Sequence, residues 1–215
     1  MGLLNSGNKG DPLKDRKNDC YETPIEATQA LLKCEGLPHK IWEPACGPGA
    51  IVYGLRNAGH HVFASDLVDY GCPDSRSGID FLMEYQPQDV EAIVTNPPFK
   101  NGGDFVRKGL ELCPRVIILQ RLAFLEGESR SDILDSGQLA RVHVFRNRLP
   151  MMHRYGWEGP KLGNTMAAYA WFVWHRDYNG PALIDRITWE EHIVVSPIEV
   201  DPKQIDMFSV TSTKE

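Results

Sequence analysis

The sequence lacks the features that mark membrane, secreted and metal-binding proteins. No apolar run approaches the roughly 20 residues that cross a bilayer, and no charged-then-apolar leader opens the chain. The 5 cysteines are odd in number and form no Cys-x-x-Cys pair, which disfavours both a zinc site and a disulfide framework. We therefore expect a cytoplasmic protein with reduced thiols, no metal and no membrane segment.

An excess of positive charge is also missing. The net charge of the 215 residues is −6, which at first argues against a nucleic-acid partner. The distribution is uneven, because residues 100–161 hold 11 Lys or Arg against 7 Asp or Glu, and the remainder holds 12 against 22. A local basic face is compatible with phosphate contact, although ordinary surface charge explains the pattern equally well.

The length and the apolar fraction of 42% predict one globular domain with a full core. We assign that domain to residues 20–208. Residues 1–19 are polar and without periodicity, which is typical of a flexible arm, and residues 209–215 read as a disordered tail.

The tetrapeptide Asn96-Pro97-Pro98-Phe99 organises the chain. Residues 92–95 before it form a short, β-branched run, typical of a strand buried on both faces. The two prolines cannot donate to a sheet ladder, so the strand must end near Asn96. The tetrapeptide is therefore expected outside the carboxyl end of a parallel strand, where open α/β sheets bind ligands.

These residue types suggest a chemistry. The Asn96 amide and the Pro97 carbonyl can accept both hydrogens of an NH2 group on adenine or on a carboxamide. Holding those hydrogens out of plane localises the nitrogen lone pair, which can then attack an electrophilic carbon. Phe99 can stack on a flat substrate. The alternative is a plain loop whose prolines end a strand and whose Phe belongs to the core.

A glycine-containing turn precedes this motif. Residues 41–50 predict a strand, a turn and the start of a helix, and Gly47 and Gly49 let the backbone approach a ligand closely. A dinucleotide fingerprint would need glycine at position 52, where Val52 stands. Asp66 ends a second expected strand, 17 positions after Gly49, near the spacing at which an acid reaches a ribose; a surface-loop aspartate is the alternative.

Other elements follow from local patterns. Thr23 as N-cap, Pro24 at the first helical position and Glu26 in a capping box predict a helix that starts at residue 24. Its N-terminus could also hold a ligand carboxylate. A helix is expected over 101–113, and strands over 115–121, 141–145 and 166–174. Short apolar runs occupy 193–195 and 198–200.

Five short motifs in this order resemble class I S-adenosylmethionine-dependent methyltransferases of the N6-adenine type. They are Tyr-x-Thr-Pro (21–24), Glu-Pro-Ala-Cys-Gly-x-Gly (43–49), Ser-Asp-Leu (65–67), Asp-Phe-Leu (80–82) and Asn-Pro-Pro-Phe (96–99). The resemblance covers residues 21–99. It implies an α/β fold with a Rossmann-like, seven-stranded sheet, helices on both faces and an antiparallel last strand, with residues 78–82 counted as the third strand.

The resemblance also implies residue roles and S-adenosyl-L-methionine as the cofactor. Asp66 would meet its ribose, and Asp80 and Phe81 its adenine. The whole cofactor set comprises Tyr21, Thr23, Pro24, Glu43, Ala45, Gly47, Gly49, Asp66, Asp80, Phe81 and Asn96. The catalytic set is Asn96, Pro97, Pro98 and Phe99, and the substrate set is Lys100, Arg121, Arg148, Arg154, Tyr155 and Trp157. For Tyr155 and Trp157, a role as loop aromatics over the core edge is the alternative.

The implied function is methyl transfer to the N6 amine of adenine in DNA by direct attack. RNA adenine or a glutamine side-chain amide is an alternative acceptor, and a non-catalytic cofactor-binding subunit is an alternative class. Residues 175–215, after the last expected strand, are too few for a separate target-recognition domain. We therefore expect a small enzyme of the orphan or phage type.

Overall fold

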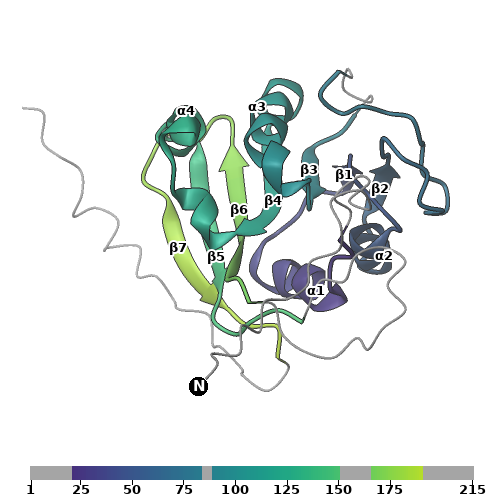
Figure 1. Ribbon diagram of the computed structural model, residues 1–215, viewed down its shortest axis with the longest axis horizontal. Coiled ribbons are helices and arrows are strands. Elements are labelled where there is room, and N and C mark those ends of the chain that lie inside the picture. Colours follow the sequence, from purple (N-terminus) through teal and green to yellow (C-terminus); the bar gives the residue numbers. More distant parts are fainter. Residues whose placement is uncertain (1–20, 84–88, 151–165, 191–215) are drawn as a thin grey trace, which may run out of the picture.

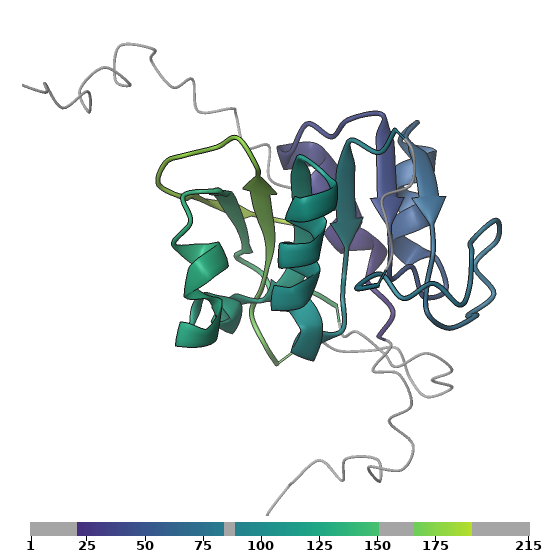
Figure 2. The same ribbon diagram turned by 90° about the horizontal axis from the view of Figure 1, so that it is seen from above.

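The computed structural model describes residues 21–83, 89–150 and 166–190. A mixed sheet of seven strands lies between two helical layers (Figures 1 and 2). The strands are β1 (Lys40–Glu43), β2 (His61–Ala64), β3 (Ala92–Thr95), β4 (Arg115–Arg121), β5 (Leu139–Phe145), β6 (Tyr169–His175) and β7 (Leu183–Ile187). The helices are α1 (Ile25–Cys34), α2 (Ala50–Asn57), α3 (Gly102–Leu112) and α4 (Ser131–Leu134).

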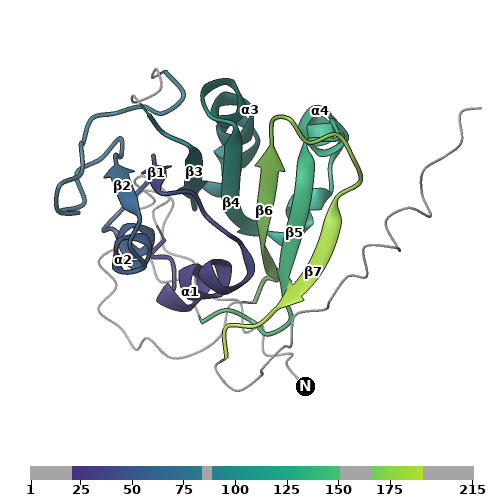
Figure 3. The same cartoon turned by 180° about the vertical axis from the view of Figure 1, so that it is seen from behind.

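The strand order is β2-β1-β3-β4-β6-β5-β7, and β6 alone among these strands is antiparallel to its neighbours. Helices α1 and α2 cover one face and α3 and α4 the other (Figure 3). The expected α/β, Rossmann-like sheet with helices on both faces is confirmed. The arrangement places the carboxyl ends of β1, β2 and β3 at one edge.

Strand β6 is the centre of the core. Its residues 169–174 are all buried, as an apolar strand inserted between two others requires. Trp171 and Trp174 point to opposite faces, and their indole N–H groups donate to the carbonyls of Ala27 (2.9 Å) and Ile133 (2.9 Å). The same strand therefore anchors α1 on one face and α4 on the other.

Two details of the predicted sheet are wrong. Residues 78–82 form a turn instead of a strand, because Gly78 has a positive φ of 76° and the Asp80 carboxylate accepts from the Leu82 N–H at 3.0 Å. The seventh strand is β7, which pairs in parallel with β5. The antiparallel strand expected over 166–174 is present as β6, but it is not the last strand.

The predicted cap of α1 is also wrong. The helix begins at Ile25, and no side chain caps it. The Thr23 hydroxyl instead accepts a hydrogen bond from Asn96 Nδ2 at 3.0 Å. A tertiary contact thus takes the oxygen that the local sequence pattern assigns to the helix end.

A buried ionic cluster fixes the other end of α1. Glu35, which follows the last residue of the helix, has a side chain only 4% exposed and forms ion pairs with Arg115 and Arg141. Arg141 binds both carboxylate oxygens, at 2.7 and 2.8 Å, and His143 Nε2 lies 2.9 Å from one of them. One carboxylate therefore holds α1 against β4 and β5.

Glu35→Gln should destabilise the protein by on the order of 3 kcal/mol, because it leaves two partly buried guanidinium groups without their counter-charge. Equilibrium unfolding in urea measures this loss. Glu26→Gln, on the same helix but outside the cluster, is the matched control and should change stability by less than about 0.5 kcal/mol. Equal effects of the two substitutions would show that the ionic cluster around Glu35 does not stabilise the fold.

Candidate functional site

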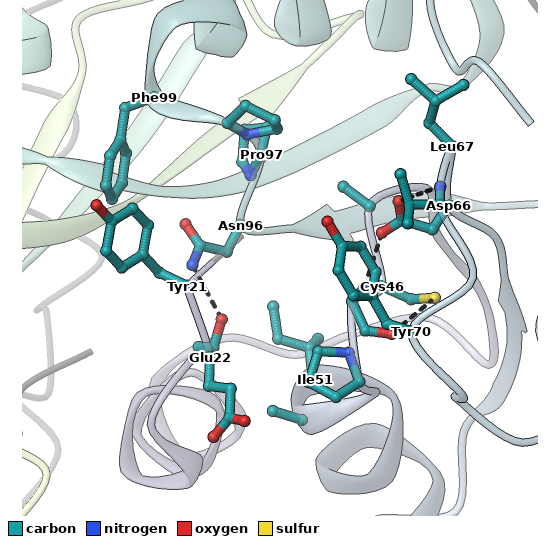
Figure 4. A pocket seen from close by; sticks show the side chains of 17 residues that line it. Tyr21, Glu22, Cys46, Ile51, Asp66, Leu67, Tyr70, Asn96, Pro97 and Phe99 are labelled. Atoms are coloured by element: carbon teal, nitrogen blue, oxygen red, sulfur yellow. Dashed lines mark hydrogen bonds between the residues drawn. The ribbon is translucent and has the colours of Figure 1, made fainter. Parts of the chain in front are cut away.

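A cavity opens at the carboxyl ends of β1, β2 and β3. It holds about 800 Å³ of empty space, part of it open to solvent. Asn96, Tyr21 and Phe99 lie on one side, and Asp66, Leu67 and Tyr70 on the other (Figure 4). The cavity therefore has two distinct walls.

The turn from β1 to α2 forms the floor between these walls. Gly47 and Gly49 both have positive φ, 50° and 98°. A Cβ on Gly49 would lie 2.8 Å from Cys72 Sγ and 3.0 Å from the Tyr53 ring, closer than packed atoms tolerate. Glycine at position 49 is thus required by backbone conformation and by space, and the turn exposes main chain to the cavity.

Asp66 ties this turn to the loop after β2. Its Oδ2 accepts from the Gly47 N–H at 2.8 Å, and its Oδ1 accepts from the Val68 N–H at 3.0 Å. Burial raises the pKa of Asp66, and these backbone hydrogen bonds oppose the shift. The carboxylate therefore sets the distance between the two loops that form the wall.

Glu43 lies beneath the floor and is fully buried. Its Oε1 accepts from the Ala45 N–H at 3.1 Å and from the Thr95 hydroxyl at 2.5 Å. Burial raises the pKa of Glu43 from 4.5 to about 8, against the effect of these hydrogen bonds. Glu43 is therefore largely protonated at neutral pH and supports the cavity from below without lining it.

Asn96 is half-buried at the end of β3. Because its Nδ2 donates to Thr23 Oγ1, the amide is turned so that its carbonyl oxygen points to the side where Tyr21 and Phe99 lie (Figure 4). Asn96 and Pro97, which follow Thr95 in the chain, both line the cavity. The hydrogen bond to Thr23 thus fixes the orientation of the amide, with its oxygen as the acceptor on that side.

An aromatic group flanks Asn96. The Tyr21 and Phe99 rings stack with centroids 6.1 Å apart, and the Phe99 and Tyr169 rings are tilted with centroids 6.0 Å apart. The guanidinium of Arg121 lies over the Phe99 ring, 4.7 Å from its centroid. This side of the cavity is therefore suited to a flat ligand.

The structure brings together most of the residues predicted to bind the cofactor or to act in catalysis. Nine line the cavity: Tyr21, Thr23, Ala45, Gly47, Asp66, Asn96, Pro97, Pro98 and Phe99. Pro24, Glu43 and Gly49 do not line the cavity, although each lies within two positions in the sequence of a residue that does. Asp80 is exposed, and Phe81 packs in the core against Trp42 (5.1 Å) and Phe105 (4.7 Å), so neither reaches the cavity.

Among the predicted substrate residues, Lys100, Arg121 and Arg148 are exposed. Arg154, Tyr155 and Trp157 lie outside the described residues. Sequence reasoning missed Leu67, Val68 and Tyr70, which follow Asp66 and form the far wall. The sequence signal that could have identified them is their position just after Asp66, the acid that follows β2.

Within the described residues, no group of His, Cys, Asp and Glu could hold a metal ion. No helix there is long and apolar enough to span a membrane.

The difference in thermal stability between Glu43→Gln and the wild type should shift in favour of the variant as the pH increases. The pKa of this carboxyl is higher in the folded state, so the wild type is most stable relative to the variant below about pH 4.5 and loses stability up to about pH 8. Gln cannot ionise. The variant should therefore gain several degrees in Tm relative to the wild type between pH 5 and pH 9; Glu126→Gln, an exposed control, should not. A difference in Tm between variant and wild type that does not change with pH would contradict the conclusion that Glu43 is buried and neutral.

No family model and no curated protein matches the sequence. Solved structures do match. One is a Pyrococcus horikoshii protein provisionally assigned as an RNA methyltransferase (15% identity, TM-score 0.52, 72% of this chain and 86% of that chain). Another is the M protein of the type I restriction enzyme EcoKI (14%, TM-score 0.54, 80% and 49%).

A third is the Agrobacterium tumefaciens protein Atu636, described as a predicted O-methyltransferase (11%, TM-score 0.51, 86% and 95%). These proteins are named for different acceptors, and at such identities the similarity concerns the fold alone. The chain has the fold of class I S-adenosylmethionine-dependent methyltransferases.

Proposed function

We propose that this protein is an S-adenosylmethionine-dependent methyltransferase that acts on the N6 amine of adenine in DNA. The observation that carries the proposal is the position of Asn96, whose oriented amide lines the same cavity as the glycine turn and Asp66. The residues that we assign to the cofactor and the residue that we assign to the acceptor amine therefore line the same cavity.

The far side of the cavity suits the cofactor. The turn at Gly47 brings main chain to the cavity, and Asp66 lies beside it with Leu67 and Tyr70 as apolar neighbours. We assign the ribose hydroxyls to Asp66, the adenine to Leu67 and Tyr70, and the methionine part to the side of Thr23. When bound, S-adenosylmethionine supplies an electrophilic methyl group on a sulfonium.

The near side suits the acceptor amine. Asn96 Oδ1 and the Pro97 carbonyl accept the two amine hydrogens, which draws the nitrogen lone pair out of conjugation with the ring. The Thr23 hydroxyl prevents the amide from turning its nitrogen to the substrate. With the cofactor bound, the amine nitrogen would form its bond to the methyl carbon as the carbon–sulfur bond breaks and a neutral thioether leaves, and the surplus proton on the nitrogen would then pass to water. Catalysis comes from positioning and hydrogen bonding, with no covalent enzyme intermediate.

An adenine must leave its base stack to reach this site, at a cost of a few kcal/mol. The aromatic group of Tyr21 and Phe99 offsets part of that cost, since stacking contributes roughly 1–3 kcal/mol per base. A glutamine side chain would gain nothing comparable from these rings. The aromatic wall therefore favours a nucleobase over a peptide amide.

Asn96→Ala should bind S-adenosylmethionine normally but reduce turnover about 100-fold or more, the scale of losing a key polar contact in the transition state. The assay is transfer of labelled methyl to unmethylated duplex DNA, single-stranded DNA and RNA. Asn101→Ala is the matched control, because Asn101 is an exposed amide on the same segment and should keep full activity.

Thr23→Val separates the two roles of Asn96. It removes the hydrogen bond to Nδ2 but keeps Oδ1, so it should cost only about fivefold, the scale of one neutral hydrogen bond. Near-normal turnover by Asn96→Ala would disprove the acceptor clamp. Label in RNA alone would change the substrate to RNA adenine, and no label despite cofactor binding would favour a protein acceptor or a non-catalytic subunit.

Asp66→Asn should weaken S-adenosylmethionine binding at least tenfold, or about 1.4 kcal/mol, because an amide group replaces a carboxylate that faces two backbone N–H donors. Isothermal titration calorimetry measures the affinity. Asp69→Asn is the control, since Asp69 is exposed in the same loop and accepts from the Gly71 N–H. An unchanged affinity for Asp66→Asn would remove Asp66 from the cofactor site.

A further inference from the structure

Arg121 is an exposed arginine that contacts the aromatic group of the candidate site. It ends β4 and pairs with Tyr169, the first residue of β6, across the sheet. Its guanidinium lies 4.7 Å from the centroid of the Phe99 ring, well within the distance of a cation–π contact. Burial raises the pKa of the neighbouring Tyr169 hydroxyl, and the positive charge of Arg121 opposes that shift. Two aromatic side chains thus lie beside the Arg121 guanidinium.

The charge of Arg121 is not neutralised by the described part of the chain. Some other arginines there do have carboxylate partners: Arg107 pairs with Asp104 and Asp132, and Arg141 pairs with Glu35. No ion pair to a described residue is formed by Arg121. A guanidinium held against an aromatic ring, with no counter-ion among the described residues, is preorganised for an external anion.

The place of Arg121 determines which anion it meets. Phe99, over which it lies, is the last residue of the tetrapeptide that begins with Asn96. A base that presents its amine to Asn96 must carry its sugar and phosphates out past this aromatic group. Arginine forms paired hydrogen bonds to phosphate oxygens, and the Arg121 side chain is exposed to solvent.

We propose that Arg121 binds a phosphate that flanks the target nucleotide, so that the site selects an adenine on a sugar-phosphate backbone over an isolated nucleoside or a peptide amide. This inference rests on the proposed function. It assigns to Arg121 a positioning role that acts on substrate binding and not on the reacting nitrogen.

The experiment compares the wild type with Arg121→Gln, which removes the charge, and Arg121→Lys, which keeps it. Arg186→Gln is the matched control, because Arg186 is exposed on β7, far along the sheet from β3. Binding to a short oligodeoxynucleotide is followed by fluorescence anisotropy over a range of salt concentrations. Methyl transfer is followed with the oligonucleotide and with deoxyadenosine, which has no phosphate.

Arg121→Gln should raise the Kd and KM for the oligonucleotide roughly tenfold, the scale of one charge-assisted hydrogen bond, with little change in kcat. The salt dependence of binding, log Kd against log salt, should fall in slope by about 1. Activity on deoxyadenosine should not change. Arg121→Lys should recover part of the binding, and Arg186→Gln should resemble the wild type.

A modified substrate tests the contact directly. A neutral methylphosphonate at the phosphates next to the methylated adenine should weaken wild-type binding, but it should not weaken binding by Arg121→Gln any further. Additive losses would overturn the proposal. So would equal losses for Arg121→Gln and Arg186→Gln, or a fall in kcat on deoxyadenosine, which would mean that Arg121 only supports Phe99.

Failure of the proposed function gives a different result. If the wild type methylates no nucleic acid, the methyltransferase proposal for DNA is wrong, while the binding measurements still decide whether Arg121 contacts phosphate. A salt slope that depends on Arg121 would support the contact. A slope that does not depend on Arg121 would refute it.

Discussion

One buried carboxyl group joins the two halves of the candidate site. Glu43 ends β1, just before the glycine turn, and accepts from the hydroxyl of Thr95, which ends β3 just before Asn96. The two residues are 52 positions apart in the chain, yet this hydrogen bond of 2.5 Å sets the spacing between the turn and the acceptor motif. The geometry of the cavity depends on a group that does not line it.

That support has an energetic cost. The second oxygen of Glu43, Oε2, is buried and has no hydrogen-bond partner in the described part of the chain. A buried charge would be far more costly than a buried neutral acid, so the carboxyl stays protonated at neutral pH. Such groups persist where the surrounding structure compensates for them, and they are common at functional sites.

The sequence was sufficient to predict the fold because its buried strands carry strong patterns. The apolar runs at 92–95 and 169–174 could hardly be placed elsewhere than inside a sheet. Strand β7 was missed because its first four residues are exposed. Its sequence therefore lacks the alternation of apolar and polar residues that marks a half-buried strand. Residues 78–82 resembled a strand locally, but Phe81 turns into the core between Trp42 and Phe105.

The composition of the site was predictable to a similar degree. Motif residues such as Asp66 and Asn96 could be named because their types and order are distinctive. Their partners could not, since the bond from Asn96 to Thr23 joins residues 73 positions apart, and the local pattern around Thr23 indicated a helix cap. Contacts that depend on how the strands are assembled leave no trace in a short sequence window.

The two walls of the cavity differ in charge, and this difference orders the ligands that we propose. Asp66 is the carboxylate of the far wall, whereas Arg121 and the aromatic rings lie on the near side. Because burial keeps Glu43 neutral, the floor adds little negative charge of its own. In the proposed complex a polyanion is therefore favoured near Arg121 and disfavoured near Asp66. The charges thus agree with the proposed arrangement, in which the nucleic acid lies on the side of Asn96 and Arg121 and the cofactor's ribose lies at Asp66 on the far wall.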